Sequence, residues 1–455
     1  MNDKKSLLKA LAATHFELSE LVLSLTNQQR SPPYHPGINP PIWEWGHTAF
    51  FHEQFMLRPI DKIAPIMPEM DFIWDSFDID HKDRWTKGVI PSIEATQAYV
   101  EEVYQRIKQR IEDKPLTPED HYLYKYVIFH QHMHIESLIW CRQTLGYPAP
   151  ATLVKTPSTK EAKITQDDAS IPSGNYQFGQ VSDSPNYATT YATTDFSFDA
   201  ERPTFNKHIK AFCISKTLVT RAEFLRFVQD GGYQRPEFWS FGGQKWLSQL
   251  RDNDTDISQS DAHQKQPQTG PIYWREQEGV WQERLFDQWQ ALNLQAPVVH
   301  VCYWEAEAWC NWADRRLPTE YEWEAAALGN LHGATHHSFP WGHTMDQNQL
   351  GESQADMNRH AFAQAPVTAL PESDGPFGLR QTIGTVWEWT SSQFLPYDGF
   401  KVDMYPYMST LQFGYHKVAR GGSCATSSDL IRGTYRQAYL PFRRDVYVGF
   451  RSCQK

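Results

Sequence analysis

The chain has no uninterrupted apolar stretch long enough to cross a lipid bilayer, so no membrane partner is expected. Its first residues carry positive charge without an apolar run behind them, which predicts an amphipathic helix rather than a signal peptide. The six cysteines are scattered without CxxC spacing. The simplest interpretation is a reduced, cytoplasmic protein.

Runs of lysine and arginine are also missing, and the net charge is -11. A chain of this sign is repelled by a phosphate backbone, so nucleic acid is not an expected partner. Neither a Walker motif nor a dinucleotide-binding glycine pattern occurs, which excludes the common phosphate-binding loops.

The length and the aromatic content are informative in another way. A chain of 455 residues is too long for one ordinary core and predicts two domains. Its 17 Trp and 21 Tyr exceed what packing usually requires. They fit either pockets for a flat or cationic ligand or simply large cores, and both interpretations stay open.

Residues 1–152 predict a four-helix bundle. Leucines recur at helical period from Leu7 to Leu25, and further helices are expected over 43–55, 92–107 and 122–145. Helices of this length pack as an antiparallel bundle, whose core can take ligands from facing helices.

Three histidines of this bundle are candidate metal ligands. His130 and His134 are four residues apart and therefore share one face of the fourth helix, where His47 of the second helix could meet them. Imidazole suits iron, zinc or copper, and three protein ligands leave positions open for substrate or oxygen. His132 and Glu136 should face away. The spacing alone also allows a His-rich, partly exposed helix.

The second half of the chain differs from the first in composition and in the pattern of its apolar residues. Residues 153–168 are polar and predict a linker, whereas residues 169–455 contain short strands, turns and aromatic clusters. Helices are expected near 220–230 and 305–313, and a third begins at Thr319 with a capping box to Glu322. The polar stretch 252–270 predicts a surface loop. The fold class is therefore α plus α+β.

Seven motifs of this second half resemble the formylglycine-generating enzymes, which have a C-type-lectin-like fold. The motifs are Ala222-Glu223-Phe224, residues 297–301, residues 316–324, Phe339-Pro340-Trp341-Gly342, residues 384–390, Arg420-Gly421-Gly422-Ser423 and Val448-Gly449-Phe450-Arg451. Formylglycine generation depends on a cysteine pair after the Arg-Gly-Gly-Ser motif. Only Cys424 follows it here, so oxidation of a sulfatase cysteine is not expected and Cys424 is interpreted as a core residue.

The first half completes a larger resemblance. Trp45-Gly46-His47, followed by His130, His134 and Glu136, resembles the DinB-like bundle of the ergothioneine-type nonheme iron sulfoxide synthases. That family joins such a bundle to such a lectin-like domain and includes hercynine-using, ovothiol-forming and selenoneine-forming members. The resemblance implies that His47, His130 and His134 bind iron(II), with O2 as co-substrate. The implied reaction joins a thiol or selenol donor to the imidazole of hercynine or histidine.

The resemblance also assigns residues of the second half. Tyr405 matches the family's proton-donating tyrosine, with Tyr407 as the alternative. Met408 stands where relatives have a tyrosine around the trimethylammonium group, so this cation pocket is expected to be built differently. Met133 likewise replaces a polar residue that some relatives use beside an iron ligand.

The expected donor pocket departs from that of relatives using γ-glutamylcysteine. Those relatives have Asn-Trp-Asp in place of Gln437-Ala438-Tyr439, and losing the aspartate to Tyr439 favours cysteine or a selenosugar as the donor. Gln437 is a candidate to bind the amino-acid end of a substrate. The candidate carboxylate-binding residues are Arg443, Arg84 and Lys87.

Several alternatives stay open. Residues 142–150 and 443–451 look more like the selenoneine-synthase branch, but sulfur and selenium donors demand the same iron chemistry. An ovothiol-type 5-histidylcysteine sulfoxide synthase, a non-catalytic bundle–lectin protein with a structural or zinc-filled site, and a DinB-like thiol transferase are the other hypotheses. Thr385 replaces an asparagine of many relatives, which leaves a structural calcium undecided, and the oligomeric state is open too.

Overall fold

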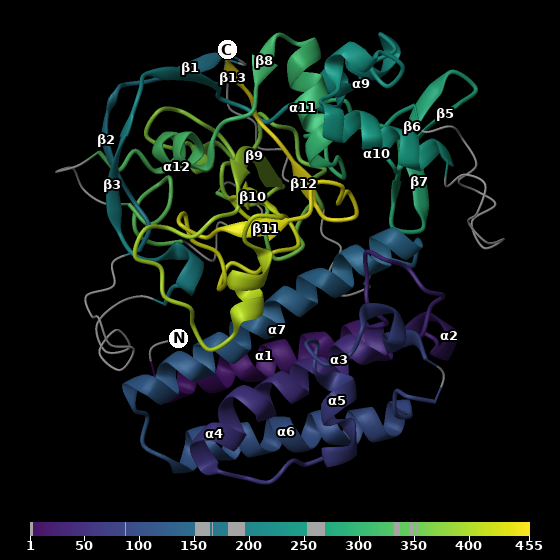
Figure 1. Ribbon diagram of the computed structural model, residues 1–455, viewed down its shortest axis with the longest axis vertical. Helices are drawn as coiled ribbons and strands as arrows, with labels where there is room; N and C mark the ends of the chain where they lie inside the picture. The colour runs from purple at the N-terminus through teal and green to yellow at the C-terminus, as the bar shows by residue number, and fades with distance from the viewer. Residues whose placement is uncertain are drawn as a thin grey trace. The chain divides into compact units, whose positions relative to one another are not determined.

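The computed structural model describes residues 3–86, 88–150, 164–165, 167–180, 196–252, 269–331, 337–345, 350 and 354–455. The chain divides into two compact units (Figure 1). The first unit consists of Met1–Pro150 and Ser182–Phe196, and the second of Ala151–Val181 and Ser197–Lys455. Within 182–196, the structure describes only Phe196. None of the helices in the described ranges has the length and apolar character needed to span a membrane.

Four long helical stretches make up the first unit, which confirms the predicted bundle (Figure 1). They are α1 (Lys4–Leu23), α3 (Pro41–His52) continued by the π-helical η1 (Glu53–Leu57) and α4 (Arg58–Asp61), α6 (Ile93–Asp113), and α7 (Pro118–Leu145). The connections contain the short α2 (Asn27–Arg30), η2 (Pro68–Met70), α5 (Asp71–Trp74) and η3 (His81–Trp85).

The ends of the longest helix follow from its sequence. Thr117 caps the N-terminus of α7 in a capping box with Asp120, and Gly146 ends the helix in the left-handed conformation. Buried residues lie on all sides of α7, so it is not the partly exposed helix that its histidines alone would allow. Phe196 adds to this burial, because its ring lies 4.9 Å from Tyr122 and 4.8 Å from Phe129.

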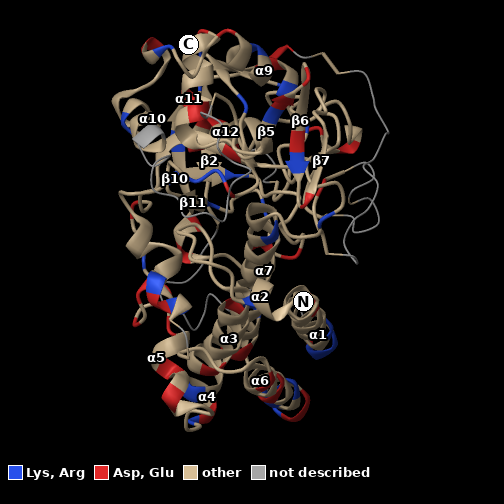
Figure 2. Ribbon diagram, turned by 90° about the vertical axis from the view of Figure 1, so that its right-hand side faces the viewer, with Lys and Arg blue, Asp and Glu red and all other residues tan. Residues whose placement is uncertain are grey.

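Charged residues of the bundle mix both signs rather than forming a basic stripe. Along the ribbon of α6, both acidic and basic residues occur (Figure 2). One such pair joins Arg106 to Glu102 at 2.6 Å, at the i,i+4 spacing that favours exposed helix pairs.

The described part of the second unit contains four small sheets. One has the order β1 (Asp168–Ile171), β4 (Phe212–Ser215), β13 (Cys453–Gln454), β8 (Arg315–Arg316), and another β11 (Gln437–Tyr439), β10 (Lys417–Arg420), β9 (Trp387–Gln393), β12 (Val448–Gly449). The others pair β2 (Gly174–Phe178) with β3 (Phe205–Ile209), and β5 (Trp274–Gln277), β6 (Val280–Leu285) and β7 (Gln288–Ala291) in sequence. All pairings are antiparallel except that of β12 with β9.

The α-helices in the described part of this unit are α9 (Arg221–Gln229), α10 (Phe241–Asp252), α11 (Tyr303–Trp312) and α12 (Glu320–Leu328). Three of them were predicted, including the capping box of Thr319 with Glu322. The helix α10 was not predicted. The expected loop over 252–270 lies mostly outside the described residues. Cys424 is fully buried as expected, and all six cysteines are free thiols.

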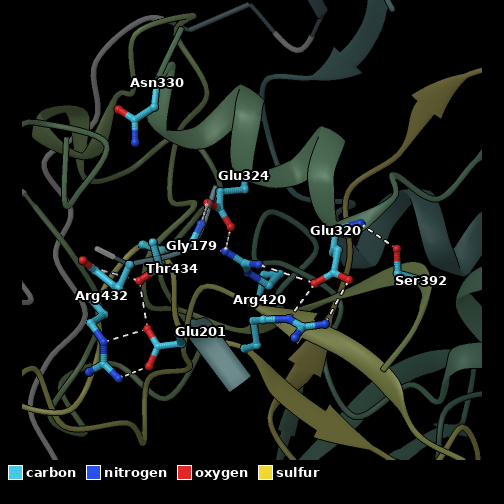
Figure 3. Close-up of polar contacts among 12 residues, drawn as sticks. Gly179, Glu201, Glu320, Glu324, Asn330, Ser392, Arg420, Arg432 and Thr434 are labelled. Atoms are coloured by element: carbon cyan, nitrogen blue, oxygen red, sulfur yellow. Dashed lines mark hydrogen bonds and ion pairs between the residues drawn. The ribbon is translucent and has the colours of Figure 1, made fainter. Parts of the chain in front are cut away.

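A network of buried ion pairs links α12 to the sheet that contains β9 and β10 (Figure 3). Arg420 donates to Glu324 at 2.5 Å, and Arg436 donates to Glu320 at 2.8 and 3.1 Å. All four side chains are buried. A buried carboxylate is tolerated when a cation with good geometry compensates the lost hydration, and this network meets that requirement.

Candidate metal centre

The side chains of His47 on α3 and of His130 and His134 on α7 converge within the first unit. One ring nitrogen from each lies within 4.8 Å of the others. The Nε2 atoms of His130 and His134 are 3.2 Å apart, and the His47 ring centroid lies 5.3 and 5.0 Å from theirs. Within the described ranges, no other group of His, Cys, Asp and Glu gathers in this way.

The cluster has the dimensions and the chemistry of a metal site. Two nitrogens bound to one divalent ion at about 2.1 Å are about 3.0 to 3.4 Å apart when the angle between them is 90 to 109°. The separation of 3.2 Å lies in that range. Burial lowers the pKa of His47 and His130 well below the ordinary value, and the neighbouring His134 lowers both further. Neutral imidazole is the form that binds a metal.

His47 is oriented by a backbone carbonyl. Its Nδ1 lies 2.7 Å from the carbonyl oxygen of Trp74, and since a carbonyl only accepts, Nδ1 carries the proton and Nε2 keeps its lone pair. The Trp74 ring lies directly against Gly46, where a Cβ would come within 2.4 Å of it. Trp43 stacks on the His47 ring, with the ring centroids 4.8 Å apart and an angle of 9° between the ring planes.

The two imidazoles of α7 are held by side chains of α3. Phe51 stacks on His130 with centroids 3.6 Å apart. Glu44 places Oε2 at 3.6 Å from Nδ1 of His134, which is an ion-pair separation slightly longer than a hydrogen bond. His132 and Glu136, expected to face away, are not members of the cluster and are buried elsewhere along α7.

Neither Trp74 nor Glu44, which contact these rings, was predicted from the sequence. Trp74 acts through its main-chain carbonyl, which leaves no side-chain pattern to recognise. Glu44 did leave a signal, because it is a charged residue on an otherwise apolar stretch and lies three positions before His47. Such a residue at i-3 shares the face of the ligand.

Of the two basic residues predicted between the second and third helices, the structure describes one. Arg84 in η3 is buried, donates from Nη1 to Oδ1 of Asn39 at 2.7 Å, and lies 4.0 Å above the Trp43 ring. It therefore contacts the residue that stacks on His47. Lys87 lies outside the described residues.

The predicted proton donor belongs to the second unit. Tyr405 directly precedes η8 (Pro406–Met408) and is buried. Its ring stacks on Tyr407, with centroids 5.9 Å apart, and Tyr407 is exposed. Met408 is half-buried at the end of the same turn.

The residues of the second half predicted to bind substrate include Gln437 and Tyr439 on β11 and Arg443 after it. Gln437 and Tyr439 are two apart on this strand and therefore point to the same face. Gln437 accepts a hydrogen bond from the Tyr435 hydroxyl at 3.2 Å. Arg443 lies 6.0 Å from the Tyr439 ring and donates to both oxygens of Asp445, at 2.6 and 2.5 Å. A substrate carboxylate would compete with Asp445 for Arg443.

Comparison with known proteins gives two family matches. The sulfatase-modifying factor enzyme 1-like domain matches residues 154–455, and the DinB superfamily matches residues 10–138. The chain is 29% identical to the hercynine oxygenase of Mycolicibacterium smegmatis, over 92% of this chain and 91% of that protein. It is 28% identical to the hercynine oxygenase of Mycobacterium tuberculosis, over 92% and 91%.

Other relatives match the second half alone. The formylglycine-generating enzyme of Bos taurus is 30% identical over 50% of this chain and 60% of that protein. Among solved structures, PvdO from Pseudomonas aeruginosa aligns with a TM-score of 0.40 and 17% identity, covering 66% of this chain and 99% of PvdO.

Proposed function

Since the chain belongs to the sulfatase-modifying factor enzyme 1-like family and carries a DinB-type bundle before that domain, we propose that it is an iron(II)- and O2-dependent oxidoreductase. It joins the sulfur or selenium of a small donor to the imidazole of hercynine, as in ergothioneine or selenoneine biosynthesis. The observation that carries the proposal is the convergence of His47, His130 and His134 in a chain similar to hercynine oxygenases over 92% of its length.

The three imidazoles fit iron(II) by donor type and by number. Neutral nitrogen ligands suit iron, and a site with three protein ligands leaves positions for exogenous groups. When bound, iron would supply the redox chemistry with O2 and would acidify the donor thiol or selenol. The residues of the bundle fix the orientation of the rings. The Trp74 carbonyl accepts a hydrogen bond from His47, and Phe51 stacks on His130.

The roles in the second unit remain part of the proposal and are supported by the resemblance. Tyr405 is assigned as proton donor, and the burial of its phenol in a stack with Tyr407 restricts its orientation. Gln437 and Arg443 are assigned to the amino-acid end of a substrate. Tyr439, in place of an aspartate, removes a negative charge and favours cysteine or a selenosugar over γ-glutamylcysteine.

The test is an anaerobic iron(II) loading followed by a donor screen. Cysteine, γ-glutamylcysteine and a selenosugar are each combined with hercynine or histidine, and O2 uptake and product mass are measured. We expect O2 consumption only when an imidazole substrate and a donor are both present. Turnover with histidine and a donor, but not with hercynine and a donor, would instead indicate an ovothiol-type enzyme. Tight metal binding without any turnover would indicate a binding protein.

A pair of variants separates the metal ligand from a merely buried histidine. His47→Gln should abolish turnover. His52→Gln is the matched control, because His52 is also buried on α3 but donates from Nε2 to the Val127 carbonyl at 3.0 Å, and glutamine keeps a donor there. Wild-type turnover by His47→Gln would overturn the proposal.

A further inference from the structure

Glu44 is a buried carboxylate that points at a candidate metal ligand. It is 1% exposed on α3. Its Oε1 accepts hydrogen bonds from Asn39 Nδ2 at 2.9 Å and from Ser137 Oγ at 2.6 Å. Its Oε2 lies 3.6 Å from Nδ1 of His134 and has no hydrogen-bond partner among the described residues.

The surroundings of Glu44 leave His134 as the group that can compensate its charge. Burial of an ionised carboxylate costs several kcal/mol unless a positive group lies close by. Asn39 and Ser137 are neutral donors, and no Lys or Arg in the described part of the chain forms an ion pair with Glu44. A cation bound at Nε2 of His134 would polarise the ring and make Nδ1–H a stronger donor towards Oε2.

A second contact fixes which way the Asn39 amide faces. Arg84 donates from Nη1 to Asn39 Oδ1 at 2.7 Å, so the carbonyl end of the amide faces Arg84 and the NH2 end faces Glu44. A chain of hydrogen bonds thus runs from Arg84 through Asn39 to Glu44. This chain of hydrogen bonds occupies Oε1 of Glu44, while Oε2 faces His134.

We propose that Glu44 is a positioning residue of the metal centre. Its Oε2 holds the proton of His134 on Nδ1, so that the Nε2 lone pair is available to the metal. The inference rests on the proposed function only for the reaction that the metal centre catalyses. The position of the His134 proton is a property of the metal-free protein. The Trp74 carbonyl places the proton of His47 on Nδ1 in the same way, so two of the three imidazoles would be protonated on Nδ1.

Replacing Glu44 by glutamine should reverse the arrangement at His134. Asn39 and Ser137 both donate to Oε1, so the glutamine carbonyl takes that place and its NH2 replaces Oε2. This NH2 donates to Nδ1 of His134, which forces the ring proton onto Nε2. The lone pair for the metal is then lost, and we expect affinity to fall about 10- to 100-fold.

Glu53→Gln is the matched control. Glu53 is equally buried, in the π-helical turn that continues α3, but it bonds to Arg58 at 2.8 Å and to the Tyr99 hydroxyl at 2.7 Å rather than to a histidine. Its substitution removes a buried carboxylate without changing a contact of the cluster. We therefore expect it to affect stability and to leave metal affinity unchanged.

The experiment measures two quantities on the full chain. Nitrogen-15 NMR of the histidines at about pH 8.5, above the ordinary histidine pKa, reports which ring nitrogen of His134 is protonated without metal. Cobalt(II) titration, followed by its visible absorption, reports affinity. The wild type should be protonated on Nδ1, and Glu44→Gln on Nε2 with the weaker cobalt binding. Glu53→Gln should match the wild type in both.

Two results would overturn the inference: protonation of His134 on Nε2 in the wild type, or wild-type cobalt affinity in Glu44→Gln. If circular dichroism shows that Glu44→Gln does not fold, the proton position in the wild type and the cobalt affinity of Glu44→Asp decide the matter. Glu44→Asp retains a carboxylate acceptor, so its cobalt affinity should stay closer to that of the wild type than the loss of about 10- to 100-fold expected for Glu44→Gln, and a loss of that size would count against the inference. Absence of turnover with every substrate pair would refute the proposed function but would not change these readouts.

Discussion

Gly46→Ala tests how closely the metal centre depends on the packing of one tryptophan. A Cβ at Gly46 would lie 2.4 Å from Cη2 of Trp74 and 2.5 Å from Cζ2 and Cζ3, whereas ordinary contact begins near 3.4 Å. The fully buried Trp74 ring must therefore move by about 1 Å. The same displacement would stretch the 2.7 Å contact between its carbonyl and His47 Nδ1 beyond hydrogen-bond range.

The expected magnitudes follow from two opposing effects. Overpacking of a buried site costs about 1 to 3 kcal/mol. Alanine in place of glycine inside a helix returns about 0.5 to 1 kcal/mol. The net loss in the free energy of unfolding is therefore about 0 to 2.5 kcal/mol. Loss of the bond to His47, at about 0.5 to 1.5 kcal/mol, should weaken metal binding by roughly 2- to 10-fold.

Urea unfolding of the metal-free protein and cobalt(II) titration measure these two effects. Gly270→Ala is the control, because a Cβ there would meet its nearest neighbour, Val228, at 3.7 Å. It should change stability by no more than about 0.5 kcal/mol. Trp74→Phe removes the three clashing atoms, so the double variant with Gly46→Ala should lose less than the sum of the single losses. Wild-type stability together with wild-type cobalt affinity in Gly46→Ala would refute the reasoning.

Three further predictions concern buried charges of the second unit, each measured by urea unfolding. Burial lowers the pKa of His300 to about 3, so the unfolded chain binds more protons below about pH 6.5. The free energy of unfolding should therefore fall as the pH drops below about 6.5. His300→Asn should flatten this pH dependence, and asparagine tolerates the φ of 61° at this position. An unchanged pH dependence in the variant would contradict the prediction. Burial raises the pKa of Asp356 to about 7, so the stability that its protonated form contributes is full below about pH 4 and is lost as the pH rises through 7. Asp356→Asn should remove this trend. Arg451→Met leaves Glu388 buried without its bidentate partner at 2.6 and 2.9 Å and should cost about 3 to 5 kcal/mol; a loss below about 1 kcal/mol would argue against the pair.

The bundle could be predicted because its information is local. The helices α1 and α6 carry a buried residue every three or four positions, and the four-residue spacing of His130 and His134 puts them on one face whatever the rest of the chain does. The Trp74 carbonyl could not be predicted, because a backbone acceptor is available at every residue. Only the tertiary path of α5 selects it.

The unpredicted helix α10 shows the opposite case, where packing overrides propensity. It begins Phe241-Gly242-Gly243, and glycine disfavours helix by up to about 1 kcal/mol per residue. The structure explains both glycines by close approach of aromatic rings. A Cβ at Gly242 would lie 2.9 Å from Trp304 Nε1, and one at Gly243 would lie 3.1 Å from the Trp239 ring.

The sheets of the second unit were reached through resemblance rather than periodicity, for a physical reason. The strands β8, β12 and β13 have two residues each, too few to show an alternating pattern. Their partners are also distant in sequence, since Cys453 pairs with both Ile214 and Arg316. Such non-local pairing leaves no local signal.

Glu44 differs from five other buried glutamates of the chain in a way that bears on the metal centre. In the second unit, an arginine pairs with each of Glu201, Glu320, Glu324 and Glu388. In the first unit, Glu53 follows the same rule with Arg58. Glu44 is as deeply buried, yet its charge faces only the Nδ1 edge of His134 among the described ion pairs. Because each of these five glutamates has a guanidinium and Glu44 has none among the described ion pairs, a cation bound at His134, as proposed above, would compensate the charge of Glu44 through the imidazole.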